Sequence, residues 1–342
     1  MDGTPETANN TENAWDRAYG AFLGLLCGDA AGATLEFSPG KITAADVERA
    51  LQMPGGGVLR VGRGQITDDS ELALSLAQGL VEHDPALGFP TDAVAKKYAE
   101  WHDSRPFDIG NTCGLAFGIA PDENGAYGER MTLAAVGGSM ASEANGALMR
   151  VLPIALWSSR LPQESIATLA RQDATLSHPN PVCQDCNAIY CQLIAHLIHH
   201  PGDYKGAIQH VEAFVKEQAN PKVQTWFSQE SLDISNLTNC KQMKGHVRWG
   251  FVLAIHFLRQ NTSYEDAIRQ TLLKGGDTDT NAAIVGGLIG ALHGERSIPE
   301  RMKAPVLGFD CTQPISRRKR PATYKSDQIL ALTQTLTGIV KP

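Results

Sequence analysis

Residues 277–294 read DTDTNAAIVGGLIGALHG, and this stretch shows the pattern that decides the fold. Two aspartates and two threonines occupy its first four positions, and such residues are favoured at the N-terminus of a helix. Ile284, Leu288 and Ala291 then recur at helical spacing, and Gly294 follows them as a stop signal. The stretch therefore predicts a buried helix with an acidic N-terminus.

Apolar residues at helical spacing recur along almost the whole chain. They form stripes within residues 15–26, 73–80, 94–101, 182–197, 208–215, 249–256 and 329–339. Ser263 and Asp266 resemble a capping box that opens a further helix. Sustained alternation of apolar and polar residues, which would indicate strands, is almost absent. The pattern predicts an all-α fold of roughly ten or more packed helices.

The domain organisation is simple. Residues 1–13 are polar and show no apolar period, which predicts a disordered N-terminal arm. Irregular stretches at about 37–66, 103–146 and 217–245 contain no clean linker, and no repeat of fixed period is visible. We therefore expect one compact multi-helix domain over residues 14–342, with long loops that serve its function.

The composition of the chain argues against several classes of protein. The 342 residues include 30 Lys and Arg against 37 Asp and Glu, a net charge of −7, which gives no support to a nucleic-acid or anionic-membrane partner. No apolar run approaches the ~18 residues of a membrane span, and the polar N-terminus lacks the features of a secretory signal. The seven cysteines lack paired zinc spacing. We expect a soluble, cytoplasmic protein.

A second acidic cluster, residues 67–70 (TDDS), opens the helix that runs through Leu80. Each cluster alone is explained by helix capping. Buried together, however, four carboxylates would repel one another strongly unless cations neutralised them. Oxygen ligands suit Mg²⁺, Ca²⁺ or Mn²⁺. The two clusters offer more oxygen donors than one Mg²⁺ usually takes from a protein, which favours two ions ~3.5–4 Å apart. A calcium-loop interpretation fails, because Ala282 and Leu288 stand where that loop needs Gly and Glu.

Six short stretches occur in an order that resembles the ADP-ribosylglycohydrolases. They are residues 24–32 (GLLCGDAAG) with Glu36, 67–70, 108–112 (DIGNT), 145–153 (NGALMRVLP), 177–178 (SH) and 275–283 (GGDTDTNAA). The resemblance spans about residues 15–294. It implies an all-helical fold with a binuclear Mg²⁺ or Mn²⁺ centre. One departure is that Ala144 stands where many members have glycine.

The resemblance also implies roles for individual residues. The metal ligands would be Thr67, Asp68, Asp69, Asp277, Asp279 and Thr280. Glu36 would lie over the cleft, and Asp108 and Asn111 would approach the ribose. The ADP-ribose pocket would be lined by Asn145, Gly146, Ala147, Met149 and His178.

The activity implied is hydrolysis of the bond between ADP-ribose and an arginine guanidinium of a modified protein. Two carboxyl groups usually serve glycosidic cleavage. We expect Asp68 to handle the proton, with Glu36 as the alternative, and Asp108 to position the sugar. A loop at 145–147, opening a helix, would offer backbone N–H groups to the pyrophosphate.

Other interpretations stay open at this point. The enzyme could cleave O-linked ADP-ribose, on serine or as an acetyl ester, or the protein could mask an ADP-ribosyltransferase through the arm at 1–13. Residues 108–111 could form a plain turn, His178 could cap a helix near Pro179, and Met149 could belong to the core. Glu36 could be a solvated helix end, and the basic run 317–320 is expected at the surface.

Overall fold

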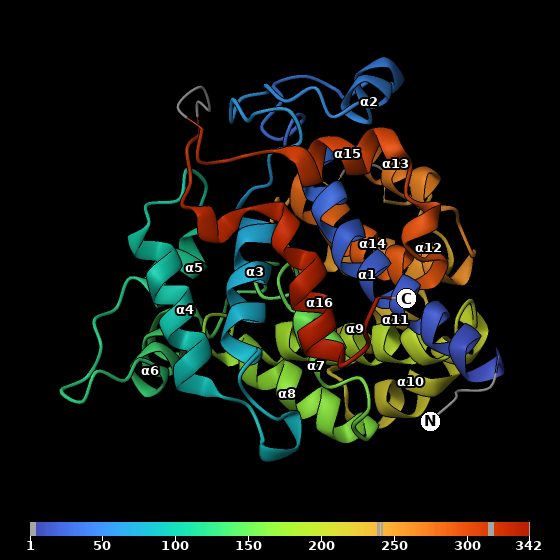
Figure 1. The fold of residues 1–342 in the computed structure, drawn as a ribbon. Coiled ribbons are helices and arrows are strands. Elements are labelled where there is room, and N and C mark those ends of the chain that lie inside the picture. The colour runs from blue at the N-terminus through green and yellow to red at the C-terminus, as the bar shows by residue number, and fades with distance from the viewer. Residues whose placement is uncertain (1–4, 238–239, 241, 314–317, 342) are drawn as a thin grey trace.

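The computed structural model describes residues 5–237, 240, 242–313 and 318–341, and within them the chain is helical, which confirms the all-α prediction (Figure 1). The α-helices are α1 (Pro5–Gly32), α2 (Ala44–Ala50), α3 (Asp68–Leu80), α4 (Thr91–Asp103), α5 (Asn111–Phe117), α6 (Gly128–Ser139), α7 (Leu152–Trp157), α8 (Gln163–Thr175), α9 (Pro181–His199), α10 (Tyr204–Gln218), α11 (Pro221–Ser228), α12 (Val247–Arg259), α13 (Tyr264–Lys274), α14 (Thr278–His293), α15 (Glu300–Gly308) and α16 (Ile329–Thr337). Short 3-10 helices lie at Pro85–Leu87, Glu230–Leu232, Glu295–Ser297, Ala322–Tyr324 and Ser326–Gln328. The β-type pairing in these residues consists of two isolated bridges, Gly56 with Val61 and Ala144 with His246.

Helices α1 and α14 pack closely against each other in the centre of the molecule. Glycines recur at every fourth residue of α1 from Gly20 to Gly32, and they bring its backbone onto α14. A Cβ atom at Gly28 would lie 2.0 Å from the carbonyl oxygen of Ala282, and one at Gly32 would lie 2.4 Å from the Cα of Asp279. No side chain fits at either position without moving α14. This contact places the acidic N-terminus of α14 beside the C-terminal end of α1.

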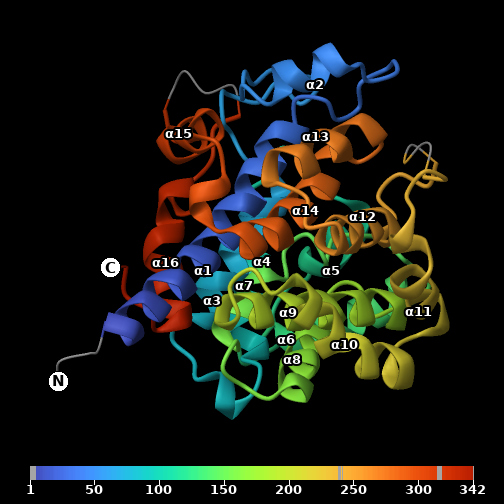
Figure 2. The same ribbon diagram turned by 90° about the vertical axis from the view of Figure 1, so that its right-hand side faces the viewer.

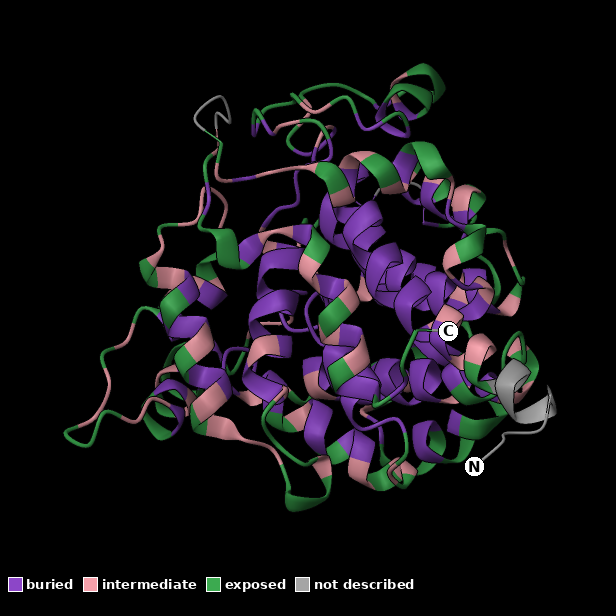
Figure 3. Ribbon diagram, in the orientation of Figure 1, coloured by how far each residue is buried: buried purple, intermediate pink, exposed green. Residues whose placement is uncertain are grey.

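The other helices surround this pair. In Figure 1, α3 to α6 lie on one side of α1 and α14, α2 and its flanking loops lie above, and α7 to α10 lie below. Figure 2 shows α12 and α13 on the remaining side, next to α14. The purple core in Figure 3 runs through α1, α3, α9 and α14, and every residue of α14 from Thr278 to Leu292 is buried. Because solvent is excluded around α14, polar groups at its N-terminus need partners or ions.

The structure confirms one local prediction and differs from two others. Ser263 is the N-cap of α13 and accepts a hydrogen bond from the backbone of Asp266, as predicted. The stretches expected to be irregular instead contain α2, α5, α6 and α11. Residues 5–13, expected to be part of a disordered arm, belong to α1, and Met1 to Thr4 lie outside the described residues. These helices are short, or at a chain end, where apolar periodicity is weakest.

The basic run at 317–320 is not wholly a solvated surface. Arg320 is 3% exposed and its guanidinium binds Glu71 of α3, with the two charged groups 2.8 Å apart. The carbonyl oxygen of Ser104 accepts a further hydrogen bond from Arg320, and the Trp101 indole N–H donates to Glu71. Arg317 lies outside the described residues. The ion pair therefore fixes the C-terminal segment against the helix that begins at Asp68.

No helix in the described part of the chain combines the length and apolar character needed to cross a membrane.

Candidate functional site

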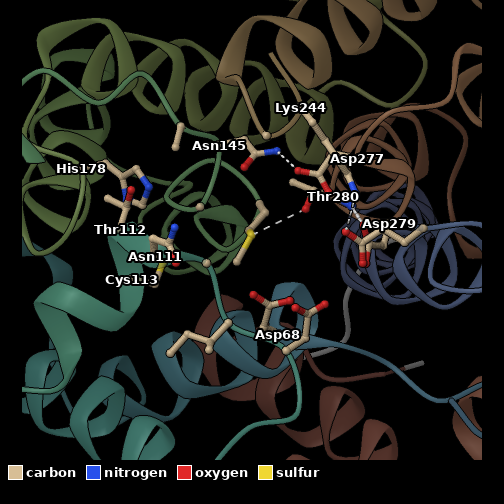
Figure 4. A pocket seen from close by; sticks show the side chains of 18 of the residues that line it. Asp68, Asn111, Thr112, Cys113, Asn145, His178, Lys244, Asp277, Asp279 and Thr280 are labelled. Carbon is tan, nitrogen blue, oxygen red and sulfur yellow. Dashed lines mark hydrogen bonds and ion pairs between the residues drawn. The ribbon is translucent and has the colours of Figure 1, made fainter. Parts of the chain in front are cut away.

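The two acidic clusters meet at one cavity. Helix α3 begins at Asp68, α14 begins at Thr278 with Asp277 as its N-cap, and both N-termini border a cavity of about 500 Å³. Of the residues singled out from the sequence, those that line it are Glu36, Asp68, Asp108, Asn111, Asn145, Gly146, Met149, His178, Asp277, Asp279 and Thr280. Figure 4 shows the carboxylates of Asp68, Asp277 and Asp279 on one side and His178, Asn111 and Thr112 on the other. The cavity therefore has an acidic side and a neutral side.

Asp29 of α1 holds the start of α3 in place. This carboxylate is buried and accepts hydrogen bonds from the backbone N–H and the hydroxyl of both Thr67 and Ser70. Burial raises its pKa to about 6, although these hydrogen bonds oppose the shift. Thr67 is the N-cap residue of α3, but its own side chain accepts no capping hydrogen bond. Asp29 accepts these hydrogen bonds instead.

Thr67 and Asp69 lie behind the cavity wall rather than on it. Both are fully buried, and the Thr67 hydroxyl is 2.9 Å from Asp69 Oδ2. The other oxygen, Asp69 Oδ1, is buried and makes no hydrogen bond. Burial raises the pKa of Asp69 well above its usual range, and the charge of Asp29 adds to the shift. An unpartnered buried carboxylate oxygen of this kind calls for a positively charged partner.

A second acidic group contains Glu36, Asp108 and Asp279. One carboxylate oxygen from each lies within 4.8 Å of the others. Burial raises the pKa of Glu36 to about 7, and it raises the pKa of Asp279 well above its usual range. The pKa of Asp108 is raised by burial and then by the charge of Asp277. Five carboxylates line the cavity, those of Glu36, Asp68, Asp108, Asp277 and Asp279, and they repel one another when all are ionised.

These donors fit hard divalent cations. All the ligand atoms offered are oxygens, which Mg²⁺ and Mn²⁺ prefer. Two of them, Asp69 Oδ1 and Glu36 Oε2, are buried without a hydrogen-bond partner. Cations here would neutralise the repulsion and would satisfy Asp69 Oδ1, which belongs to the ligand set implied by the sequence. The raised pKa values of Asp69 and Asp279 indicate the same need for cations. The protein itself supplies too little positive charge to balance these carboxylates when they are ionised.

The neutral side of the cavity is shaped by a buried arginine. Arg150 Nη1 donates to the carbonyl oxygen of Gly146 at 2.7 Å, and its Nε donates to the Tyr98 hydroxyl at 2.9 Å. His178 packs against Gly146, where an added Cβ would lie 2.9 Å from the imidazole ring. Burial lowers the pKa of His178 well below its usual value, so the ring is neutral at pH 7. Arg150 is therefore a positioning residue for the loop that enters the cavity.

The structure of this loop differs from the sequence-based expectations in several respects. Ala147 is buried and does not line the cavity. No helix begins at 145–147, because residues up to 150 form turns and α7 starts at Leu152. The Asn145 backbone N–H donates to the carbonyl oxygen of Gly245 and is not offered to a ligand. His178 caps no helix either, since the N-cap of α9 is Asn180.

Other lining or supporting residues were not singled out from the sequence. They are Asp29, Phe37, Ile109, Gly110, Thr112, Cys113, Lys244 and Gly245. Asp29 lies within the 24–32 motif, where it is the one carboxylate among small and apolar residues. This pattern could have identified it as a candidate. Lys244 carries no such signal, because it lies in a stretch that has no readable period.

Comparisons with known proteins agree with this geometry. The profile of the family described as ADP-ribosylglycohydrolase matches residues 10–331. The chain is 33% identical to the ADP-ribosyl-[dinitrogen reductase] glycohydrolase of Rhodospirillum rubrum, over 83% of this chain and 88% of that protein. It is 27% identical to an ADP-ribosylarginine hydrolase of Pseudomonas putida, over 94% of this chain and 82% of that protein. A solved structure, an ADP-ribosylglycohydrolase-related protein complex, superimposes with a TM-score of 0.72 at 25% identity, covering 96% of this chain and 99% of that one.

Proposed function

This chain belongs to the ADP-ribosylglycohydrolase family, and from that premise we propose that it removes ADP-ribose from modified arginine side chains of proteins. The observation that carries the proposal is the cavity itself, whose acidic side faces a neutral side with Asn111, Thr112 and His178. The relative named as an ADP-ribosylarginine hydrolase supports the arginine linkage. The modified protein is the expected partner.

We propose Thr67, Asp68, Asp69, Asp277, Asp279 and Thr280 as the residues that would hold two divalent cations, Mg²⁺ or Mn²⁺. Such ions, when bound, lower the pKa of water and fix the orientation of ribose hydroxyls. The hydrogen bond from the Asn145 amide to Asp277 Oδ2, at 2.9 Å, orients one of these carboxylates. The chain thus supplies both the donors and a support for them.

We assign different roles to the residues around the scissile bond. Asp108 and Asn111 lie together where the backbone enters α5, and we assign to them the orientation of the ribose. Asp68 handles the proton of the attacking water, with Glu36 as the alternative. Guanidine leaves readily only when protonated, and a carboxyl group with a pKa of about 7, such as Glu36, can deliver that proton near neutral pH and then pair, as a carboxylate, with the guanidinium.

The cellular setting is part of the proposal. All seven cysteines are free thiols and buried, as is common in a reducing compartment, and we infer a cytoplasmic location. The role of residues 1–13, including the masking of a transferase, stays a prediction.

The experiment that tests the function is a release assay. We expect the protein to liberate ADP-ribose from an ADP-ribosylarginine peptide when Mg²⁺ or Mn²⁺ is present, and to lose that activity in EDTA. A matched ADP-ribosylserine peptide should be a much poorer substrate. Release from the serine peptide alone would refute the arginine linkage, and equal release with and without EDTA would refute the role of the cations.

A further inference from the structure

Glu36, Phe37 and Lys244 form a small cage for a cation at the rim of the cavity. Lys244 Nζ lies 3.2 Å from Glu36 Oε1 and 3.3 Å from the centroid of the Phe37 ring. Phe37 is 50% exposed, whereas Glu36 is 4% exposed. All three residues line the cavity, and Figure 4 shows Lys244 beside Asp277. A carboxylate and an aromatic face therefore hold one positive charge at the entrance to the site.

We infer that the Glu36–Phe37 cage is the binding site for the guanidinium of the arginine leaving group, and that Lys244 occupies it when no substrate is bound. The inference rests on the proposed function, because it supplies the recognition of arginine that the reaction requires. It assigns Phe37 as a specificity-determining residue and Lys244 as an internal competitor.

The chemistry of the cage suits a guanidinium better than an ammonium. A guanidinium is planar, stacks on an aromatic ring and donates two parallel hydrogen bonds to a carboxylate. Lys244 binds one oxygen of Glu36, and the other oxygen, Oε2, is buried without a hydrogen-bond partner. An arginine-linked substrate would satisfy both oxygens. A serine-linked substrate is neutral at this position and offers neither the charge nor the donors.

The backbone holds both halves of the cage in place. Phe37 has a φ of +56°, which is uncommon for a bulky residue, and with this backbone its side chain is half exposed at the rim of the cavity. On the other side, Lys244 lies in a segment tied to the cavity loop. The Ala144–His246 bridge and the hydrogen bond from Asn145 N–H to the Gly245 carbonyl oxygen make that tie. The cage therefore exists before any substrate arrives.

The test compares Phe37→Leu and Lys244→Met on arginine-linked and serine-linked peptides. Phe37→Leu removes the aromatic face, so we expect KM for the arginine-linked peptide to rise about fivefold to tenfold. Lys244→Met removes the competitor, so KM for the arginine-linked peptide should fall. Neither variant should change KM for the serine-linked peptide or the affinity for free ADP-ribose. Tyr204→Leu is the matched control, because it removes a cation–π pair with Lys205 outside the cavity.

The outcomes separate this inference from the proposed function. If the wild-type protein cleaves the arginine-linked peptide and Phe37→Leu changes both substrates alike, the cage is refuted and the function stands. If Lys244→Met raises KM for both peptides, Lys244 binds the ADP-ribose part and the inference is again refuted. If the wild-type protein cleaves only the serine-linked peptide, the proposed function fails, and the cage fails with it.

Discussion

Replacing Asp279 by asparagine lowers the rate of ADP-ribose release by on the order of 10²–10³-fold, the cost expected when one preorganised charged group is removed from an active site. Asparagine keeps the shape of the side chain but has one neutral amide in place of a carboxylate oxygen. Because Asp279 lies within reach of Glu36 and Asp108, its loss also weakens cation binding. Steady-state kinetics on an ADP-ribosylarginine peptide at saturating Mn²⁺ measure this effect.

The same variant should be more stable than the wild type when cations are removed. Burial raises the pKa of Asp279 well above its usual range, and the nearby Glu36 and Asp69 carboxylates raise it further. A neutral amide removes that repulsion. Thermal unfolding in EDTA, followed by circular dichroism, should therefore show a higher Tm for Asp279→Asn. Mn²⁺ should raise the Tm of the wild type by more than that of the variant.

A pH dependence follows from the same carboxylates. Asp29 and Glu36 have folded-state pKa values of about 6 and about 7, above their usual ones. Between the unfolded and folded values the folded state binds more protons, so in EDTA the free energy of unfolding falls as pH rises from about 4 to about 7. The slope of wild-type stability against pH should accordingly be negative in this window, and Asp279→Asn should make it shallower.

Glu164→Gln is the control for Asp279→Asn, because Glu164 lies in the first turn of α8 and does not line the cavity. It should change neither the activity nor the response to Mn²⁺. An Asp279→Asn protein that keeps wild-type activity, or that unfolds at a lower temperature than the wild type in EDTA, would contradict the account.

Replacing Arg150 by methionine should destabilise the protein by about 3–5 kcal/mol, because one partner of a buried ion pair is removed. Arg150 and Asp173 are both fully buried, with Nε and Oδ2 3.4 Å apart. Methionine leaves Asp173 with only the Tyr98 hydroxyl as a side-chain donor. The free energy of unfolding from urea denaturation measures the loss. Affinity for ADP-ribose should also fall, because the Gly146 carbonyl oxygen loses its donor.

A second variant distinguishes loss of the pair from general damage to the core. Arg150→Met/Asp173→Leu removes both charges and should recover part of the lost stability. Arg171→Met is a matched control, since its pair with Asp185 is partly exposed and we expect a cost of about 1 kcal/mol or less. The account is wrong if the double variant is less stable than Arg150→Met, or if Arg171→Met costs as much.

The sequence predicts the helical fold and the two acidic clusters because both follow from local patterns, whereas the other residues of the cavity follow only from the family resemblance. The acidic clusters are contiguous, and the apolar stripes behind them show that each helix is buried. Their meeting at one cavity depends on a contact that no local pattern reveals, the approach of Gly28 and Gly32 to α14. Regularly spaced glycines allow another helix to approach closely, but the spacing alone does not identify that helix.

What the sequence does not predict depends on contacts between distant residues. Arg320 was expected at the surface because its neighbours are charged, but Glu71 supplies a buried partner 249 positions away. The helix expected at 145–147 was wrong because Asn-Gly favours a turn as strongly as a helix start. The segment of Lys244 is tied to the cavity loop by the bridge between Ala144 and His246 and by the hydrogen bond from Asn145 N–H to the Gly245 carbonyl oxygen, and both join residues about 100 positions apart.

The central claim is that the N-termini of α3 and α14 together hold divalent cations. The most direct measurement is anomalous diffraction from crystals grown with Mn²⁺, collected near the manganese edge. The account predicts two peaks at the acidic edge of the cavity, between Asp68 and Asp69 on one side and Asp277 and Asp279 on the other. A cavity without manganese at saturating Mn²⁺, or peaks at other sites alone, would contradict it.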